Sequence, residues 1–170
     1  MRVPSSQEVY AAGRLQELNL SPIDSIKFYL KRMHTGFVAL DPATGAVRSW
    51  VGGVHHGFMP YDHVGKHMNR QAGSTFKPIV YAAALEAGLS PCEYIEAEAV
   101  RYAQEEGTWQ PGNSDGQYAG KYSMEGALAN SVNTVSVKLL EQAGISQTIT
   151  LAQELGIARD IPQVPSIALG

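Results

Sequence analysis

Cysteine is nearly absent from this chain, and the chain has neither a long apolar run nor an excess of positive charge. The single Cys92 excludes an internal disulfide, although it does not fix the cellular compartment. The formal net charge of −3 excludes a basic surface for nucleic acid and a polybasic patch for anionic membranes. No apolar stretch approaches about 18 residues, and residues 1–20 lack the apolar core of a signal peptide. An apolar content of 44% still allows one sizeable core, so a single domain is the default expectation.

A serine and a lysine three residues apart, Ser74 and Lys77, are the most informative feature that is present. At the expected start of a helix, positions i and i+3 share one face, so the ammonium group can reach the hydroxyl. A lysine accepts a serine proton only if burial and local positive potential lower its pKa, and a helix N-terminus supplies such potential. Chance alone predicts about half a Ser-x-x-Lys in this composition, so a plain helix cap with a solvated lysine is the alternative.

A second motif, Ser131-Val132-Asn133, follows 57 residues after Ser74 and is the only Ser-x-Asn in the chain. It lies between two apolar helical patterns. Its hydroxyl can relay a proton and its carboxamide can hold a substrate amide, which a serine–lysine acyl-transfer site still needs. The same residues could also be an N-cap pair for a helix that begins at Thr134, and both roles are compatible.

The two motifs and their flanks resemble the transpeptidase domain of class A penicillin-binding proteins. Residues 36–53 resemble the opening hairpin of the family, and residues 70–73 lead into the serine much as they do there. Residues 109–134 follow the family's approach to its second motif, and residues 165–170 resemble a segment beyond it. The resemblance covers roughly residues 34–170.

Two departures from the family pattern affect the interpretation. Ala72 replaces the proline that is usual before the Gly-Ser pair. The third motif of the family, Lys-Thr-Gly or Lys-Ser-Gly, is absent, because no lysine follows Lys138 and the chain stops 37 residues after Asn133. In the family this motif contributes a cation for the substrate carboxylate and a strand that supplies an oxyanion-hole amide. The chain therefore resembles a fragment that holds two of the three walls of the active site.

The resemblance implies a fold of the α/β (α+β) class, the penicillin-binding or serine β-lactamase-like fold, with an antiparallel sheet and a helical subdomain, here truncated. Residues 1–33 would be a linker or pre-domain segment, and residues 34–170 would be the N-terminal portion of the transpeptidase domain.

The implied activity is that of a serine D,D-transpeptidase of peptidoglycan crosslinking, which forms an acyl-enzyme. In that reaction Ser74 is the nucleophile, Lys77 the base, Ser131 a catalytic proton relay and Asn133 a substrate-binding residue. The resemblance implies no metal and no cofactor. We expect the fragment itself to be inactive or weak.

The implied partners are peptidoglycan stem peptides that end in D-Ala-D-Ala, β-lactam antibiotics, and a glycosyltransferase domain upstream in a parent chain, but no nucleic acid. The fragment is also expected to self-associate. The implied location is extracytoplasmic, either periplasmic or at the outer face of the cytoplasmic membrane, with the anchor outside this fragment. Two alternatives stay open: a non-catalytic penicillin-binding sensor or scaffold module, and a serine β-lactamase.

Four histidines between residues 55 and 67 form the one rival site: His55, His56, His63 and His67. The spacing of His63 and His67 suits two ligands on a helix, and Asp62 would be a third ligand. The surrounding glycines and Pro60 instead predict a loop, and no HExxH glutamate is present. A solvated loop is therefore the preferred interpretation.

The local patterns predict the following elements. Residues 1–20 are expected to be polar and weakly helical, and a long functional loop is expected over residues 104–123. The expected helices are Ser21 to about Met33, Ser74–Ala87 with a left-handed cap at Gly88, and residues 123–129, 133–143 and 146–155; residues 37–40 and 46–51 are expected to form a hairpin.

Overall fold

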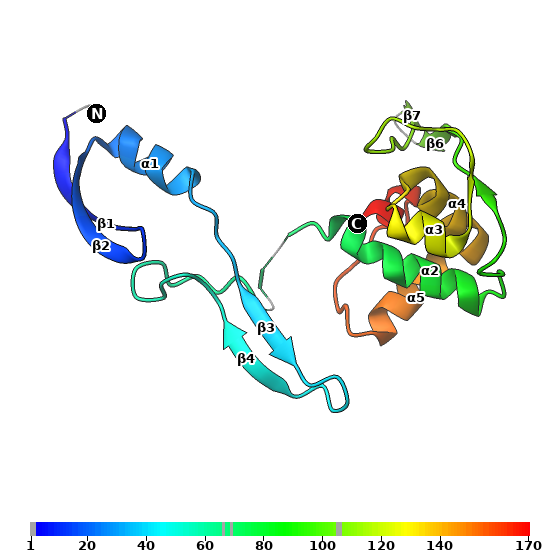
Figure 1. Cartoon of the computed structure of the whole chain (residues 1–170), viewed down its shortest axis with the longest axis horizontal. Coiled ribbons are helices and arrows are strands. Elements are labelled where there is room, and N and C mark those ends of the chain that lie inside the picture. Colours follow the sequence, from blue (N-terminus) through cyan, green and yellow to red (C-terminus); the bar gives the residue numbers. More distant parts are fainter. Residues whose placement is uncertain (1–2, 66, 69, 105–106) are drawn as a thin grey trace. The chain divides into compact units, whose positions relative to one another are not determined.

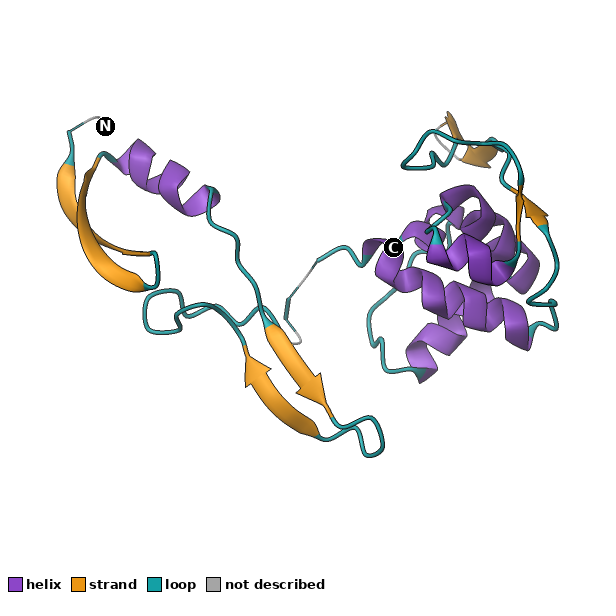
Figure 2. Cartoon of the chain, in the orientation of Figure 1, coloured by secondary structure: helices purple, strands orange, loops and turns teal. Residues whose placement is uncertain are grey.

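The computed structural model describes residues 3–65, 67–68, 70–104 and 107–170, so residues 105 and 106 of the predicted 104–123 loop lie outside the described residues. The chain divides into two compact units, Met1–Arg70 and Gln71–Gly170. Strands dominate the first unit and helices dominate the second (Figures 1 and 2). This mixture of helices and strands agrees with the predicted α/β (α+β) class.

The first unit begins with a hairpin instead of the weakly helical segment that the sequence suggested, and this prediction was wrong. Strand β1 (Ser5–Ala11) pairs antiparallel with strand β2 (Arg14–Leu20) along their whole length. Ala12 and Gly13 connect the strands, and both have positive φ angles, 52° and 78°. A two-residue loop of this kind matches the twist of a hairpin. This turn is hard to predict from the sequence, because alanine rarely adopts a positive φ.

Helix α1 (Pro22–Leu30) follows, and its start agrees with the predicted start at Ser21, which is the N-cap residue. The Ser21 hydroxyl accepts a hydrogen bond from the Asp24 amide at 3.2 Å, and Pro22 occupies the first turn, where its missing N–H costs little. The helix ends at Leu30, before the predicted end near Met33.

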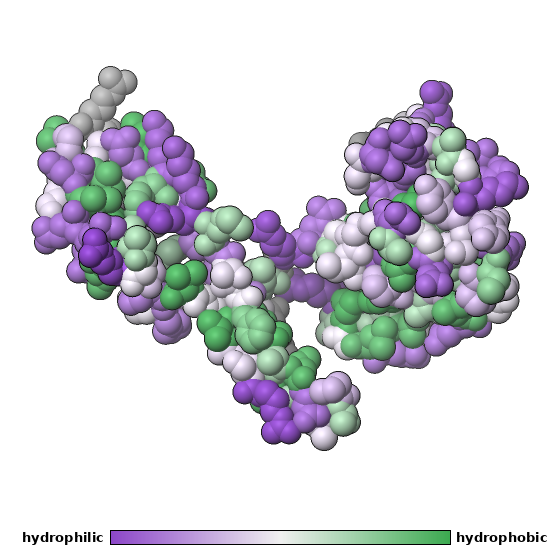
Figure 3. Space-filling view, in the orientation of Figure 1, coloured by the Kyte–Doolittle hydropathy of each residue, from purple (hydrophilic) through white to green (hydrophobic). Residues whose placement is uncertain are grey.

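Strands β3 (Phe37–Leu40) and β4 (Val47–Val51) form the predicted antiparallel hairpin. At its turn the Asp41 carboxylate accepts hydrogen bonds from two backbone amides and binds Arg48. In the structure this sheet has two strands, and apolar side chains gather over it (Figure 3). Val38 is 39% exposed and its cross-strand partner Trp50 is 48% exposed, so the hairpin is poorly covered.

The second unit contains the helices that were predicted around the two motifs. They are α2 (Lys77–Glu86), α3 (Met124–Ala129), α4 (Asn133–Ala143) and α5 (Ile145–Glu154), with the short 3₁₀ helices η1 (Gly73–Phe76) and η2 (Pro165–Leu169). The predicted left-handed residue after α2 is present, because Gly88 has a φ of 87°. No helix among the described residues is long and apolar enough to cross a bilayer.

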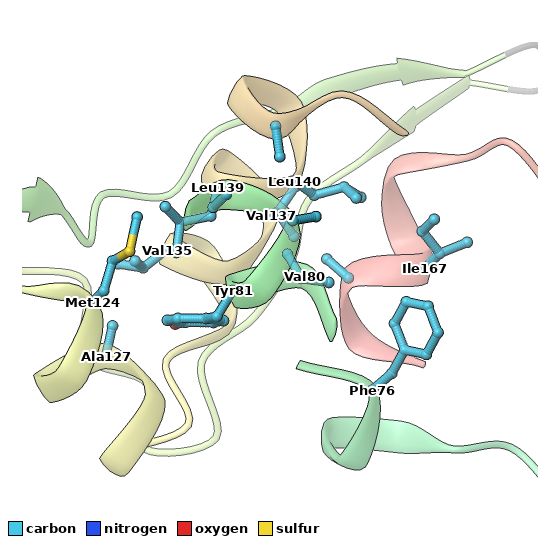
Figure 4. Packing of buried hydrophobic residues seen from close by; sticks show 14 of the residues in the cluster. Phe76, Val80, Tyr81, Met124, Ala127, Val135, Val137, Leu139, Leu140 and Ile167 are labelled. Atoms are coloured by element: carbon cyan, nitrogen blue, oxygen red, sulfur yellow. The ribbon is translucent and has the colours of Figure 1, made fainter. Parts of the chain in front are cut away.

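The core of this unit lies between α2 and α4. Val80 of α2 and Val135, Leu139 and Leu140 of α4 are fully buried. Their spacing places them on facing stripes of the two helices. Figure 4 shows these side chains converging, with Ile167 of η2 at one side of the cluster. The core therefore fixes α2 against α4, and these two helices begin at the two sequence motifs.

The predicted loop over residues 104–123 is partly wrong, because short strands flank and enter it. Strand β6 (Tyr102–Gln104) pairs with β7 (Gly107–Trp109), and β5 (Ile95–Glu96) pairs with β8 (Lys121–Tyr122). The segment between β7 and β8 contains no strand or helix in the structure. The centroid of the Trp109 ring lies 5.6 Å from that of the Tyr102 ring, so the two aromatic side chains pack together.

Candidate active site

Ser74 lies in the turn that leads into α2. The α-helix begins at Lys77 and not at Ser74, because Pro78 has no N–H to donate to the Ser74 carbonyl in the α-helical pattern. The Lys77 amide donates to this carbonyl instead, which closes the 3₁₀ turn η1. Gly73 enters the turn with a φ of 58°, a conformation that favours glycine. The Ser74 side chain is exposed at the surface.

Ser131 lies in the tight turn between α3 and α4. Its φ of 53° is in the left-handed region, which is uncommon for a residue with a side chain. The Ser131 and Val132 amides donate to the carbonyls of Leu128 and Ala127, so two bonds tie the turn to the end of α3. Strained backbone of this kind often occurs where a side chain must be aimed at a functional site.

Lys77 brings the two motifs together. Its side chain is 1% exposed, and its Nζ donates to three oxygen atoms: the Ser131 carbonyl at 2.7 Å, the Ser131 hydroxyl at 2.9 Å and the Asn133 carboxamide oxygen at 2.6 Å. The Ser131 hydroxyl in turn donates to Ser74 Oγ at 3.2 Å. The four residues that the sequence predicted as site residues thus form one continuous hydrogen-bond network.

The network differs from the sequence expectation in one respect. The spacing of Ser74 and Lys77 predicted a direct approach of the ammonium group to the hydroxyl, but in the described part of the chain no hydrogen bond joins them. The Ser131 hydroxyl lies between them and bonds to both. A proton that moves from Ser74 to Lys77 in this geometry passes through Ser131.

The electrostatics of the site centre on Lys77. Burial lowers the pKa of Lys77 from its ordinary value, because the charged ammonium loses solvation. Its three acceptors are neutral oxygen atoms, which use all three ammonium protons and favour the charged form. The lysine can therefore be held in place while charged, and burial still makes loss of its proton easier than in water.

Asn133 is held from two directions. Its Nδ2 donates to the Gly112 carbonyl at 2.6 Å, and its backbone amide donates to Asn113 Oδ1 at 2.9 Å. Asn113 Oδ1 also accepts from the Thr134 amide at 3.1 Å. The predicted N-cap role of Ser131 and Asn133 was wrong, because the N-cap residue is Val132 and Asn113 satisfies the first amides of α4. Sequence reasoning missed Asn113, since it lies 20 residues upstream of the helix that it caps.

Residues of the predicted histidine site between positions 55 and 67 contact groups of the first unit instead of a shared metal position. His55 Nδ1 accepts from the Phe58 amide at 3.1 Å, and the His63 ring stacks on His34 with centroids 5.3 Å apart. The Asp62 carboxylate accepts from two backbone amides, of which that of Val64 lowers its pKa most, and from Trp50 Nε1, which lowers it further. Over the described ranges, no group of three His, Cys, Asp or Glu side chains is arranged to hold a metal ion.

Comparison with known proteins assigns the second unit and the β3–β4 hairpin to one family. A family model described as the penicillin-binding protein transpeptidase domain matches residues 35–163, which include Ser74, Lys77, Ser131 and Asn133. The chain belongs to this transpeptidase family. The match begins close to residue 34, where the resemblance in the sequence also begins.

Several relatives in the transpeptidase family match most of this chain. Penicillin-binding protein 1A of Neisseria flavescens is 38% identical over 137 residues, which cover 78% of this chain and 17% of the relative. Penicillin-binding protein 2D of Bacillus subtilis is 35% identical over 142 residues, which cover 81% of this chain and 20% of the relative. The crystal structure of penicillin-binding protein 1A from Haemophilus influenzae matches with a TM-score of 0.76 at 29% identity, over 81% of this chain and 21% of that chain.

These matches establish the penicillin-binding fold for this chain. The chain spans about a fifth of the length of the relatives that it matches.

Proposed function

We propose that this chain carries the nucleophile side of a serine D,D-transpeptidase active site, which crosslinks peptidoglycan through an acyl-enzyme on Ser74. The observation that carries the proposal is the hydrogen-bond path from Ser74 through Ser131 to the buried Lys77, within a transpeptidase-family domain. An exposed hydroxyl joined to a partly desolvated amine is the arrangement that activates a serine nucleophile.

In the proposed acylation, Ser74 Oγ attacks the carbonyl carbon between the two D-alanines of a stem peptide. The Ser74 proton passes through the Ser131 hydroxyl to the neutral amine of Lys77. The negative charge of the tetrahedral intermediate develops beside the Ser74 amide, where a backbone N–H stabilises it. The carbon–nitrogen bond then breaks. Ser131 passes a proton to the leaving D-alanine amine and recovers one from Lys77.

In the second half of the reaction, an amine of another stem peptide attacks the ester on Ser74. A new carbon–nitrogen bond forms, the carbon–Oγ bond breaks, and the amine's proton returns along the same path to Ser74. Asn133 holds the backbone of the bound peptide. A β-lactam imitates the D-Ala-D-Ala substrate and leaves a stable ester on Ser74. This chemistry takes place outside the cytoplasmic membrane, alongside a glycosyltransferase domain in a longer parent protein with its own anchor.

Mass spectrometry of a penicillin adduct tests this function. A protein that carries this sequence within a complete transpeptidase domain is treated with penicillin and digested, and the adduct is expected on the peptide that contains Ser74. Ser74→Ala is the control and should carry no adduct. An adduct on another peptide, or none in an intact domain, would end the assignment.

Two further assays on the same protein, β-lactam turnover and crosslinking of stem peptides, separate the two alternatives. Continuous turnover of a chromogenic β-lactam would indicate a serine β-lactamase, because only that enzyme also activates a deacylating water. A stable stoichiometric adduct without crosslinking of stem peptides would indicate a penicillin-binding sensor or scaffold. A stable adduct together with crosslinking supports the transpeptidase.

A further inference from the structure

Asn113 lies outside the two motifs but bonds to the residues at the start of α4. Its Oδ1 accepts from the amides of Asn133 and Thr134 at 2.9 Å and 3.1 Å. Its Nδ2 donates to the Gln117 carbonyl at 2.7 Å and to Thr134 Oγ1 at 3.3 Å. One side chain thus ties the start of α4 to the turn at residues 113–117.

The backbone next to Asn113 also fixes the side chain of Asn133. The Gly112 carbonyl accepts from Asn133 Nδ2 at 2.6 Å, while Asn133 Oδ1 accepts from Lys77 Nζ at 2.6 Å. A flipped carboxamide would set its NH₂ group against the lysine and its oxygen against the carbonyl, so only one orientation satisfies all four groups. Gly112 and Asn113 therefore hold both the main chain and the side chain of Asn133.

Asn113 is needed here because α4 has no cap of its own. The N-cap residue Val132 has no side-chain oxygen, and the first amides of a helix have no partner within the helix. Without Asn113, the amides of Asn133 and Thr134 would have to donate to water, and the first turn of α4 would become less stable. Asn133 would then move together with this turn.

We propose that Asn113 is a positioning residue. It acts through Asn133 to keep an acceptor on the Lys77 ammonium, and so it influences whether the lysine of the acyl-transfer site is charged or neutral. The proposal rests on the proposed function for its chemical meaning. Its structural part, a coupling between Asn113 and Lys77 across two residues, can be measured without any substrate.

The test compares Asn113→Ala and Asn113→Asp with the unchanged 170-residue chain. Amide exchange is followed at Asn133 and Thr134, and the Lys77 side chain is titrated by NMR with labelled lysine. In Asn113→Ala, exchange of both amides should become at least tenfold faster, because their acceptor is gone. The pKa of Lys77 should fall further, because a mobile Asn133 no longer stabilises the ammonium.

The conservative variant should behave differently. Asn113→Asp keeps an oxygen that accepts from both amides, so they should be better protected than in Asn113→Ala. Their protection should stay below the unchanged level, because aspartate loses the NH₂ group that donates to the Gln117 carbonyl. Its added negative charge should move the pKa of Lys77 upward, opposite to the effect of alanine. As a matched control, Asp115→Ala removes the bond from the Gln117 amide in the same turn without touching α4, and should leave the Lys77 titration unchanged.

The outcomes separate this proposal from the proposed function. A Lys77 titration that Asn113→Ala leaves unchanged, despite faster amide exchange, would reduce Asn113 to a structural cap and overturn the proposal. In a complete domain, Asn113→Ala should also slow acylation by a fluorescent penicillin about tenfold. If the unchanged domain carries no adduct on Ser74, the proposed function fails, whereas the NMR result still decides whether Asn113 is coupled to Lys77.

Discussion

The two units of this protein differ in how far their apolar side chains are buried. In Gln71–Gly170 the apolar residues of four helices interlock in one buried cluster (Figure 4). In Met1–Arg70 only Val9 and Ala11 are buried apolar residues among those described, while large side chains such as Phe37, at 59%, stay exposed. Helices that pack side by side can cover one another, but a two-stranded hairpin offers no second layer and needs another element to cover it.

The largest expected difference between the units is in the cost of removing a buried side chain. Leu140→Ala should lower the free energy of unfolding by about 2–5 kcal/mol, because the fully buried leucine leaves a cavity. Val38→Ala in the β3–β4 hairpin should change it by less than about 0.5 kcal/mol, since the valine is 39% exposed. Urea denaturation of both variants measures this. Equal costs would mean that the hairpin is covered in solution and that the two units do not differ in this respect.

The next largest expected effect is on the rate of acylation. It should appear only for substitutions in the second unit, which holds all four candidate site residues. In a complete domain, Lys77→Ala should slow acylation by at least about 10²-fold, and Lys77→Arg should fail equally because a guanidinium does not lose its proton. His56→Ala, a matched change at an exposed histidine of the first unit, should leave the rate unchanged. A Lys77→Arg variant with near-normal acylation would refute the base role.

The same lysine predicts a pH dependence. Its pKa is lowered by burial, so the neutral amine appears at a lower pH than in an unfolded chain, and acylation should rise as pH rises through this lowered value. Stability should also rise with pH between the folded pKa and about 10.4, because the unfolded chain binds more protons in this window. Stopped-flow acylation and urea denaturation across pH test the two trends.

Substitutions in the two units should also differ, by a smaller amount, in their effect on self-association. The resemblance to the family implies further strands beside the β3–β4 hairpin, and an uncovered strand edge pairs readily with another chain. We expect the 170-residue chain to self-associate, and Val38→Lys to weaken this, while Leu155→Lys at an exposed site of the second unit should not. Light scattering provides the measurement. A stable monomer with normal penicillin acylation would mean that the third motif is not needed.

The smallest expected effect is a loss of folding stability at high pH. Burial, and then the nearby Glu141 carboxylate, raises the pKa of Tyr102 to about 12. The neutral tyrosine therefore contributes stability that is fully present below about pH 10 and is lost as pH rises toward 12. Tyr102→Phe should flatten this decline, and Glu141→Gln should reduce it in part. Denaturation midpoints between pH 9 and 12 would show it, and an unchanged slope in Tyr102→Phe would contradict it.

Local patterns predicted most of the helices and one of the hairpins. The cap at Ser21, the stop at Gly88 and the apolar spacing of α4 act through neighbours along the chain, so the sequence reveals them directly. The β1–β2 hairpin was missed because its turn, Ala12-Gly13, lacks the asparagine or aspartate that normally marks a positive φ. The pairing of β6 with β7 was missed because strands of three residues carry little periodic signal.

The candidate site residues could be identified from the sequence alone, since Ser74 with Lys77 and Ser131 with Asn133 are recognisable as motifs. The way in which they connect depends on the tertiary structure. It placed the Ser131 hydroxyl between Ser74 and Lys77, 57 positions from the serine, and brought Asn113 to the start of α4. Contacts at such separations depend on the packing of α2 against α4, because nothing in the local chain conformation specifies which distant side chain fills a given hydrogen bond.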